Sequence, residues 1–273
     1  MTRLDVDLSG IGVRVTGLSD LLGAALAHRW GRFVTALQGE PVFSVTVEAE
    51  PPSARVHPFA PKTMRSEIAD GGASFAIDQG TAVVSRSGAI TICLVATTTE
   101  LQAAGLVNLL MAAIAWRLPE MDAVLLHAAG IVLDGRAFVL VGGEGTGKST
   151  WASLAREAGA EVLGDDLVLV HRREALACPF RAEASTLRVP GRWPLAAVLA
   201  ASHAKAASLA EEPAIKTQAR LAANAPFAVD GWGSGGALDR LLDRLVHDVP
   251  HRTLAFARDA SFVPLLIRSA GGR

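Results

Sequence analysis

Residues 142–150, GGEGTGKST, constrain the fold of this chain more than any other stretch. The order of Gly142, four further residues, Gly147, Lys148 and Ser149 fits the pattern of a phosphate-binding loop. The apolar run AFVLV before it indicates a buried strand, and STWASLAREAG after it has the spacing of a helix that ends on a glycine. Strand, loop and helix together predict an α/β fold with phosphates bound at the amino end of the helix.

The residue types in this stretch suit the binding of a nucleotide phosphate. Glycines let the backbone turn successive N–H groups inward around a phosphate. Lys148 would reach the β- and γ-phosphates of ATP, and the Ser149 hydroxyl is placed to hold Mg²⁺. A chance glycine turn is the alternative. We assign the whole run to nucleotide binding: Gly142, Gly143, Glu144, Gly145, Thr146, Gly147, Lys148, Ser149 and Thr150.

Two adjacent carboxylates follow the loop. Asp165 stands 17 positions after Lys148, a distance of one helix and one strand, so the pair is expected to return beside the phosphates. One carboxylate can hold Mg²⁺ and the other can accept the proton of an incoming hydroxyl group. We expect Asp166 to be the base and Asp165 the carboxylate on the metal side. Two acids that only cap a turn are the alternative.

Other side chains near the loop carry weaker signals. His127 lies in LLHAAG, one strand before the loop, where a lone histidine is more often a core residue than a catalyst. Trp151, in the first turn of the helix, is expected to pack in the core rather than touch the nucleotide. Four arginines are candidates for binding phosphate or an acidic substrate: Arg172, Arg173, Arg188 and Arg192.

Composition limits the partners and the location. The 273 residues carry a formal net charge of −1, which gives no electrostatic reason to expect nucleic acid or a membrane surface as a partner. Cys93 and Cys178 are far apart and are expected to be buried thiols. Residues 101–118 form the most membrane-like segment, but polar residues interrupt it and we expect a core helix. The amino-terminal sequence resembles no signal peptide, so we expect a cytoplasmic protein.

The pattern along the chain predicts two parts. Residues 1–97 favour short strands, with one helix over 19–37 and an exposed, proline-rich connection over 51–62. Residues 98–273 hold the loop and are expected to form the second domain. Within it we predict a hairpin turn at Asp134-Gly135, followed downstream by these elements: a helix over 195–209, a loop-rich region over 211–236, a helix over 238–246, a strand at HRTLAFA and a closing apolar element over 262–267.

Taken together, LLHAAGIVLDGRAFVLVGGEGTGKST and EVLGDDLVLV resemble the catalytic core of the HPr kinase/phosphorylase family, in its HPr-kinase-related branch. The resemblance covers about residues 124–172. It implies a fold similar to the catalytic domain of phosphoenolpyruvate carboxykinase. It also implies that His127 lies near an aspartate of the pair, that Lys148 binds phosphate, that Ser149 contacts the metal, and that the pair Asp165-Asp166 supplies the base for a serine hydroxyl.

One part of the family pattern is missing. The glycine-rich signature after the aspartate pair, close to EIRGLG in bacterial HPr kinases, is replaced here by TLRVPGRWP. We therefore assign no downstream glutamate to the metal. The HPr-kinase-related branch includes enzymes encoded with ribosomally made peptides, among them lasso peptides, whose precursors they phosphorylate on serine. Family members often form oligomers, so the resemblance also suggests a homo-oligomer.

These observations predict an Mg²⁺- and ATP-dependent kinase that acts on a serine hydroxyl of a peptide or small protein, with a lasso-peptide precursor as one candidate. A small-molecule kinase of the shikimate-kinase type is an alternative, because it also places an acid at a similar distance after the loop lysine. A nucleotide-binding regulator without transfer activity is a third hypothesis.

Overall fold

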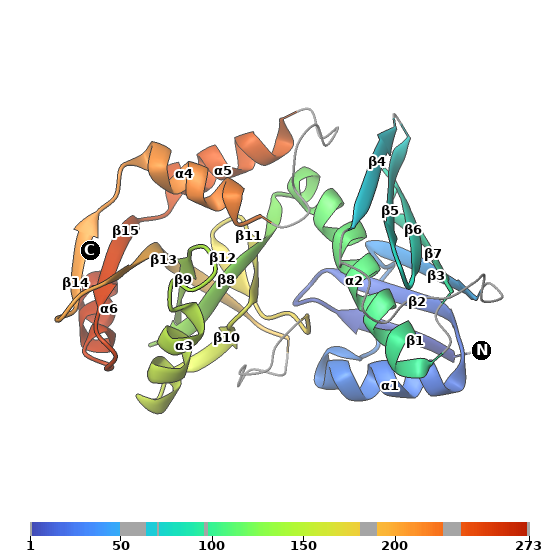
Figure 1. The fold of residues 1–273 in the computed structure, drawn as a ribbon, viewed down its shortest axis with the longest axis horizontal. Coiled ribbons are helices and arrows are strands. Elements are labelled where there is room, and N and C mark those ends of the chain that lie inside the picture. Colours follow the sequence, from blue (N-terminus) through green and yellow to red (C-terminus); the bar gives the residue numbers. More distant parts are fainter. Residues whose placement is uncertain are drawn as a thin grey trace. The chain divides into compact units, whose positions relative to one another are not determined.

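The computed structural model describes residues 2–49, 64–69, 71–95, 98–180, 190–225 and 236–271. These residues form two compact units, with the boundary between Arg117 and Leu118 (Figure 1). Both units combine helices with a mixed sheet, so the chain has a mixed α/β fold. The predicted proline-rich connection over 51–62 lies outside the described residues.

Unit 1 is built on a seven-stranded sheet with the order β1-β2-β3-β7-β6-β5-β4. β3 pairs in parallel with β2 and β7, and the other pairs are antiparallel. Alternating burial along β6 shows that one face of the sheet is buried and the other is exposed. The strands are β1 (Thr2–Asp7), β2 (Gly12–Leu18), β3 (Phe43–Ala49), β4 (Arg65–Ala69), β5 (Gly72–Ile77), β6 (Gly80–Ser85) and β7 (Ala89–Leu94).

Helix α2 (Thr99–Arg117) packs on strands β5, β6 and β7, and on helix α1 (Asp20–Trp30). The segment Thr99–Met121 is long and apolar enough to cross a membrane by length and composition, but 67% of its apolar window is buried inside the structure. The prediction of a core helix is therefore confirmed. Because α2 belongs to unit 1, the boundary of the compact units follows this helix, whereas the boundary predicted from the sequence, at residue 97, precedes it.

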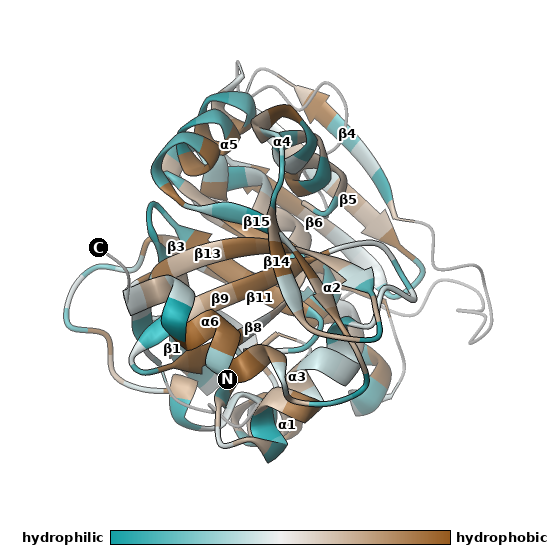
Figure 2. Cartoon of the chain, turned by 90° about the vertical axis from the view of Figure 1, so that its left-hand side faces the viewer, coloured by the Kyte–Doolittle hydropathy of each residue, from teal (hydrophilic) through white to brown (hydrophobic). Residues whose placement is uncertain are grey.

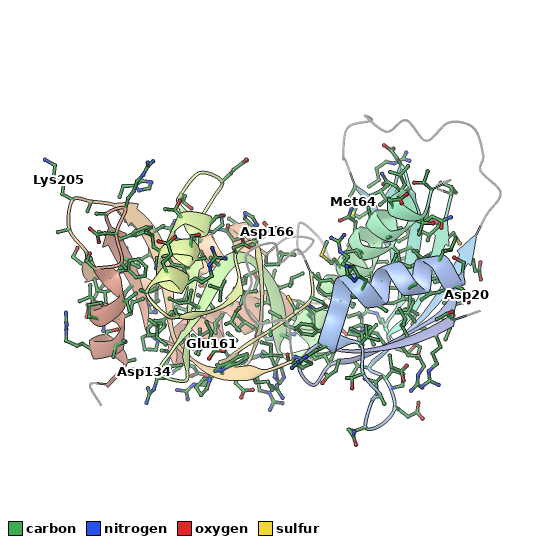
Figure 3. The ribbon with its side chains drawn as sticks, turned by 90° about the horizontal axis from the view of Figure 1, so that it is seen from below. Asp20, Met64, Asp134, Glu161, Asp166 and Lys205 are labelled. Carbon is green, nitrogen blue, oxygen red and sulfur yellow. The ribbon has the colours of Figure 1, made fainter. Side chains whose placement is uncertain are left out.

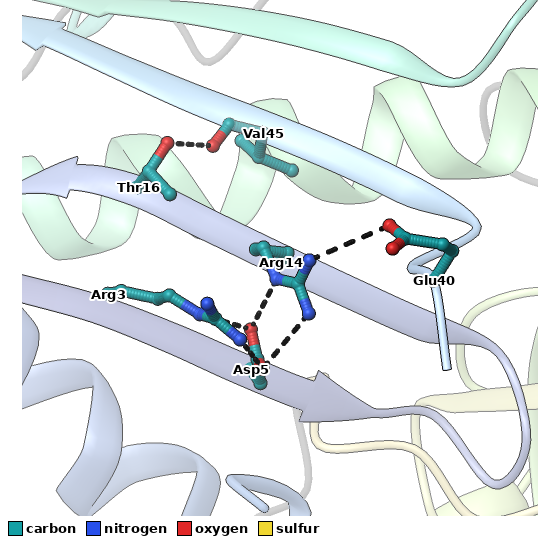
Figure 4. Close-up of polar contacts among 6 residues, drawn as sticks. All are labelled: Arg3, Asp5, Arg14, Thr16, Glu40 and Val45. Atoms are coloured by element: carbon teal, nitrogen blue, oxygen red, sulfur yellow. Dashed lines mark hydrogen bonds and ion pairs between the residues drawn. The ribbon is translucent and has the colours of Figure 1, made fainter. Parts of the chain in front are cut away.

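An ion-pair network stabilises the start of the sheet in unit 1 (Figure 4). Asp5 on β1 accepts hydrogen bonds from Arg3 at 2.5 Å and from Arg14 on β2 at 3.0 Å. Arg14 also lies 3.8 Å from Glu40. The hydrogen bond from Arg3, followed by the contact with Arg14, lowers the pKa of Asp5 to about 2, although partial burial opposes this shift.

Unit 2 is built on an eight-stranded sheet with the order β10-β8-β11-β12-β13-β15-β14, in which β9 pairs with β8 and β13. The strands are β8 (Ala123–Leu133), β9 (Arg136–Val141), β10 (Glu161–Gly164), β11 (Leu167–His171), β12 (Glu174–Leu176), β13 (Arg192–His203), β14 (Ser208–Glu211) and β15 (His251–Phe256). The helices are the 3₁₀ turn η2 (Leu118–Met121), α3 (Lys148–Glu157), α4 (Ala214–Ala223), α5 (Ala237–Asp248) and α6 (Phe262–Gly271).

Strands β9, β13 and β15 run parallel to one another, so their carboxyl ends meet at one edge of the sheet. Helices α3 and α6 cover one face of these strands. Trp151 of α3 is fully buried and packs against Phe262 of α6, with 5.9 Å between ring centroids. Burial of a large aromatic side chain stabilises a fold by about 1.5–3 kcal/mol. The expected core position of Trp151 is confirmed.

The predicted helix over 195–209 is wrong, because these residues form β13, a turn and β14. β13 pairs with β9 on one edge and with β15 on the other, and Figure 2 shows it as part of a hydrophobic sheet with β9 and β11. Helix propensities of ordinary residues differ by at most about 0.7 kcal/mol, which two full ladders and burial outweigh. The alanines that suggested a helix instead pack in a central strand.

The other predictions for unit 2 have mixed outcomes. The hairpin turn is confirmed, since Asp134 and Gly135 both have positive φ, at 48° and 71°. The predicted helix over 238–246, the strand HRTLAFA and the closing element correspond to α5, β15 and α6. The loop-rich prediction for 211–236 is wrong for residues 214–223, which form α4 on α5. Residues 226–235 lie outside the described part of the chain.

Candidate active site

The glycine-rich loop, residues 142–147, connects the end of β9 to the start of α3, as the sequence predicts. Gly147 has φ of 92°, a left-handed conformation that favours glycine, and it is the residue from which α3 begins. The Thr146 hydroxyl donates a 2.8 Å hydrogen bond to the Gly143 carbonyl and holds the loop closed. No side chain caps the amino end of α3. Backbone N–H groups of its first turn can therefore bind an anion.

Lys148 is buried, with 7% of its surface exposed. Its ammonium group donates hydrogen bonds to the carbonyl oxygens of Gly142, at 2.6 Å, and Gly143, at 3.0 Å. Burial lowers the pKa of Lys148, while the nearby carboxylates of Asp166 and Glu144 oppose this shift. The two hydrogen bonds hold the Lys148 ammonium group against the loop, whereas the next two residues, Ser149 and Thr150, are exposed.

The aspartate pair interrupts a strand. β10 and β11 lie on the same edge of β8, and the chain between them is Asp165-Asp166. The backbone carbonyl of Asp166 accepts a 3.1 Å hydrogen bond from the Ala128 N–H, so the chain stays beside β8 through the interruption. A Cβ atom on Gly164 would lie 2.4 Å from the Leu167 carbonyl oxygen. Only glycine allows the close approach of backbone that forms this bend.

The bend places Asp166 beside His127. The two side chains form a pair, with His127 Nδ1 at 2.9 Å from Asp166 Oδ1, and each is about one third exposed. A carboxylate only accepts hydrogen bonds, so His127 Nδ1 carries the proton in this pair. The Asp166 carboxylate is also close enough to Lys148 to raise the pKa of the lysine, against the effect of burial. The contact between the histidine and one aspartate, expected from the family resemblance, is present here.

Strand pairing around Ala128 of β8 places the glycine-rich loop, His127 and Asp166 at the same height along neighbouring strands of the sheet. Val141, the last residue of β9 before the loop, pairs with Ala128 of β8. His127 directly precedes Ala128 in β8, and Asp166 lies across from Ala128 on the edge of β8 opposite to β9. The hairpin turn at Asp134 is at the opposite end of the β8–β9 ladder; Figure 3 labels both Asp134 and Asp166. The loop, the histidine and the carboxylate therefore converge through strand pairing alone.

The remaining predicted site residues are less closely tied to this centre. Asp165 is half-buried, and Ser149 is exposed at the start of α3. Among the described residues, no group of three or more His, Cys, Asp or Glu side chains is arranged to hold a metal ion. Mg²⁺ bound here would take much of its coordination from nucleotide phosphates and water, as it commonly does in kinases.

Of the arginines considered as phosphate ligands, the three that the structure describes lie away from the loop. Arg172 and Arg173 lie in the turn after β11, and the end of β11 is roughly 17 Å along the strand from Asp166. Arg192 contacts His171 Nδ1 at 2.6 Å. Arg188 lies outside the described residues.

Sequence reasoning missed two contacts of the site. The Asn224 carbonyl, after the last turn of α4, accepts a 2.6 Å hydrogen bond from the His127 N–H. This bond occupies the edge of β8 at the point where β9 leaves the sheet to enter the loop. His203, at the end of β13, lies against Gly147. Neither residue belongs to a motif, and their places near the site follow from the order of the strands and from the position of α4.

The chain matches no protein-family model, and no curated protein matches it significantly.

Proposed function

We propose that this protein is an Mg²⁺- and ATP-dependent kinase that transfers a phosphoryl group to a serine hydroxyl of a peptide or small protein. One observation carries the proposal: the glycine-rich loop, Lys148 and the His127–Asp166 pair meet at one level of the sheet. A loop that only turns the chain needs no buried lysine and no carboxylate nearby. A phosphoryl-transfer site needs both.

The proposed reaction assigns a role to each group. The backbone N–H groups of the loop and the Lys148 ammonium bind the β- and γ-phosphates, so Lys148 exchanges its loop carbonyls for phosphate oxygens. Ser149 and Asp165 would hold Mg²⁺, which would neutralise charge on the phosphates. The serine oxygen attacks the γ-phosphorus, the bond from that phosphorus to the β,γ-bridging oxygen breaks, and ADP leaves.

Asp166 accepts the proton of the serine hydroxyl in this proposal. His127 holds the carboxylate in position through its Nδ1–H, and the Asn224 carbonyl holds the backbone of His127. In this proposal the base lies beside β8, and the phosphates bind to the loop that follows the neighbouring strand β9.

We also propose that the chain belongs to the HPr-kinase-related branch and shares the fold of the phosphoenolpyruvate carboxykinase catalytic domain. The antiparallel β8–β9 hairpin that leads into the loop, and the proximity of His127 and Asp166, support this. A cytosolic location fits the proposal, because ATP is available there and because neither Cys93 nor Cys178 is in a disulfide.

Incubation with γ-labelled ATP and a panel of acceptors tests the proposed reaction. The panel contains serine-containing peptides, including the products of neighbouring genes, and small hydroxylated metabolites. We expect mass spectrometry to show the gain of one phosphate on a serine of a peptide. Transfer to a metabolite alone would indicate a small-molecule kinase instead, and binding of ATP without transfer to any acceptor would indicate a regulator.

A further inference from the structure

His203 lies against the glycine-rich loop, and its ring carbon Cε1 is the ring atom nearest to Gly147. A Cβ atom built on Gly147 would lie 3.4 Å from His203 Cε1, so no side chain separates the ring from the loop backbone. Cε1 is bonded to both ring nitrogens. The two ring nitrogens therefore flank the ring atom that lies nearest to the loop.

A series of aromatic contacts supports this orientation. The His203 ring packs against Phe256 of β15, with 6.3 Å between centroids. Phe256 packs against Phe262 at 5.7 Å, and Phe262 packs against Trp151 in the helix that follows the loop. Phe256 is only 3% exposed, so it can position the imidazole but cannot itself contact a ligand.

The imidazole has hydrogen-bonding capacity that the described residues do not use. His203 is exposed, and neither of its ring nitrogens has a hydrogen-bond partner among the described residues. It stands at the carboxyl end of β13, the parallel neighbour of β9. Ligands of open α/β sheets bind outside the carboxyl ends of parallel strands, next to the loop that follows one of them. A donor placed there faces the site of the phosphates.

We propose that His203 donates a hydrogen bond to the phosphates of the bound nucleotide and is a donor-binding residue outside the loop motif. This inference rests on the proposed function, since it needs a nucleotide at the loop. The imidazole supplies one N–H donor when neutral and two when protonated. A contact with the nucleobase or ribose from the same position is the competing chemistry, and the choice of probe separates the two.

Calorimetric titration of the full chain with Mg²⁺–ADP and with Mg²⁺–tripolyphosphate, which has neither base nor ribose, tests the proposal. We expect His203→Ala to weaken the binding of both probes about tenfold, the effect of losing one hydrogen bond to a charged group. His203→Gln keeps an N–H donor and should recover part of the affinity. His247→Ala, which removes an exposed histidine from α5, is the matched control and should bind both probes like the wild type.

The outcomes separate the inference from the function on which it rests. Weakened binding of ADP with unchanged binding of tripolyphosphate would assign His203 to the nucleoside and overturn the phosphate contact. Unchanged binding of both probes would overturn the role of His203 altogether while leaving the loop assignment standing. If the wild-type protein binds neither probe, both the inference and the proposed function fail.

Discussion

His127 Nδ1 lies 2.9 Å from Asp166 Oδ1, and both residues stand beside Ala128, the partner of the last β9 residue before the glycine-rich loop. The pairing of three strands thus fixes the distance between a carboxylate and a phosphate-binding loop. Distances between paired strands change little in a packed sheet. This matters because phosphoryl transfer depends on positioning and on electrostatic stabilisation.

Asp166→Asn removes the proposed base and keeps the shape of the side chain. We expect the rate of transfer at saturating ATP to fall by about two to four orders of magnitude, with the affinity for ATP nearly unchanged. Steady-state kinetics and calorimetry measure the two effects separately. Glu161→Gln, an exposed change at the start of β10, is the control. Loss of ATP affinity without loss of rate at saturation would assign Asp166 to binding instead.

Gly164→Ala tests the bend that carries the aspartate pair. The added methyl group would lie 2.4 Å from a backbone carbonyl oxygen, so the backbone must move. We expect the free energy of unfolding to fall by about 1–3 kcal/mol and the transfer rate to fall with it, because the carboxylates shift. Chemical denaturation and kinetics measure these effects. Gly271→Ala, whose added carbon meets nothing within 4 Å, should change neither quantity, and a fully active Gly164→Ala protein would contradict the role of the bend.

Asp5→Asn removes the carboxylate of the network in unit 1. The ordinary carboxyl pKa of 3.8 is lowered to about 2 in the folded chain, so the ion pairs stabilise the fold above pH 4. We expect the variant to lose about 1–2 kcal/mol of unfolding free energy at pH 7. The stability advantage of the wild type should shrink as the pH falls from 4 to 2 and disappear below pH 2, where Asp5 is protonated in the folded chain as well. Denaturation at several pH values measures it, with exposed Asp78→Asn as the control. A difference of the same size at pH 4 and at pH 2 would rule out this cause.

The elements around the loop could be predicted from sequence because their signals are local. A strand, four glycines, a lysine and a helix are consecutive, and the Asp134-Gly135 turn also depends only on its own residues. The strand β13 could not be predicted in the same way, because its conformation depends on β9 and β15, which are distant in the sequence. For the same reason, the sequence did not predict that His203 and Asn224 lie near the site. Their positions follow from strand order and helix packing, which local sequence patterns do not show.

The central claim is that the glycine-rich loop and Lys148 bind the phosphates of a nucleotide, and calorimetric titration of Mg²⁺–ATP into the wild type and into Lys148→Ala tests it most directly. We predict that the wild type binds ATP and that Lys148→Ala binds it about a hundredfold more weakly while it stays folded, because a buried charge directed at the phosphates is lost. Lys216→Ala, an exposed change on α4, should bind ATP like the wild type. Equal affinity of a folded Lys148→Ala protein and the wild type, or no binding of ATP by the wild type, would contradict the claim.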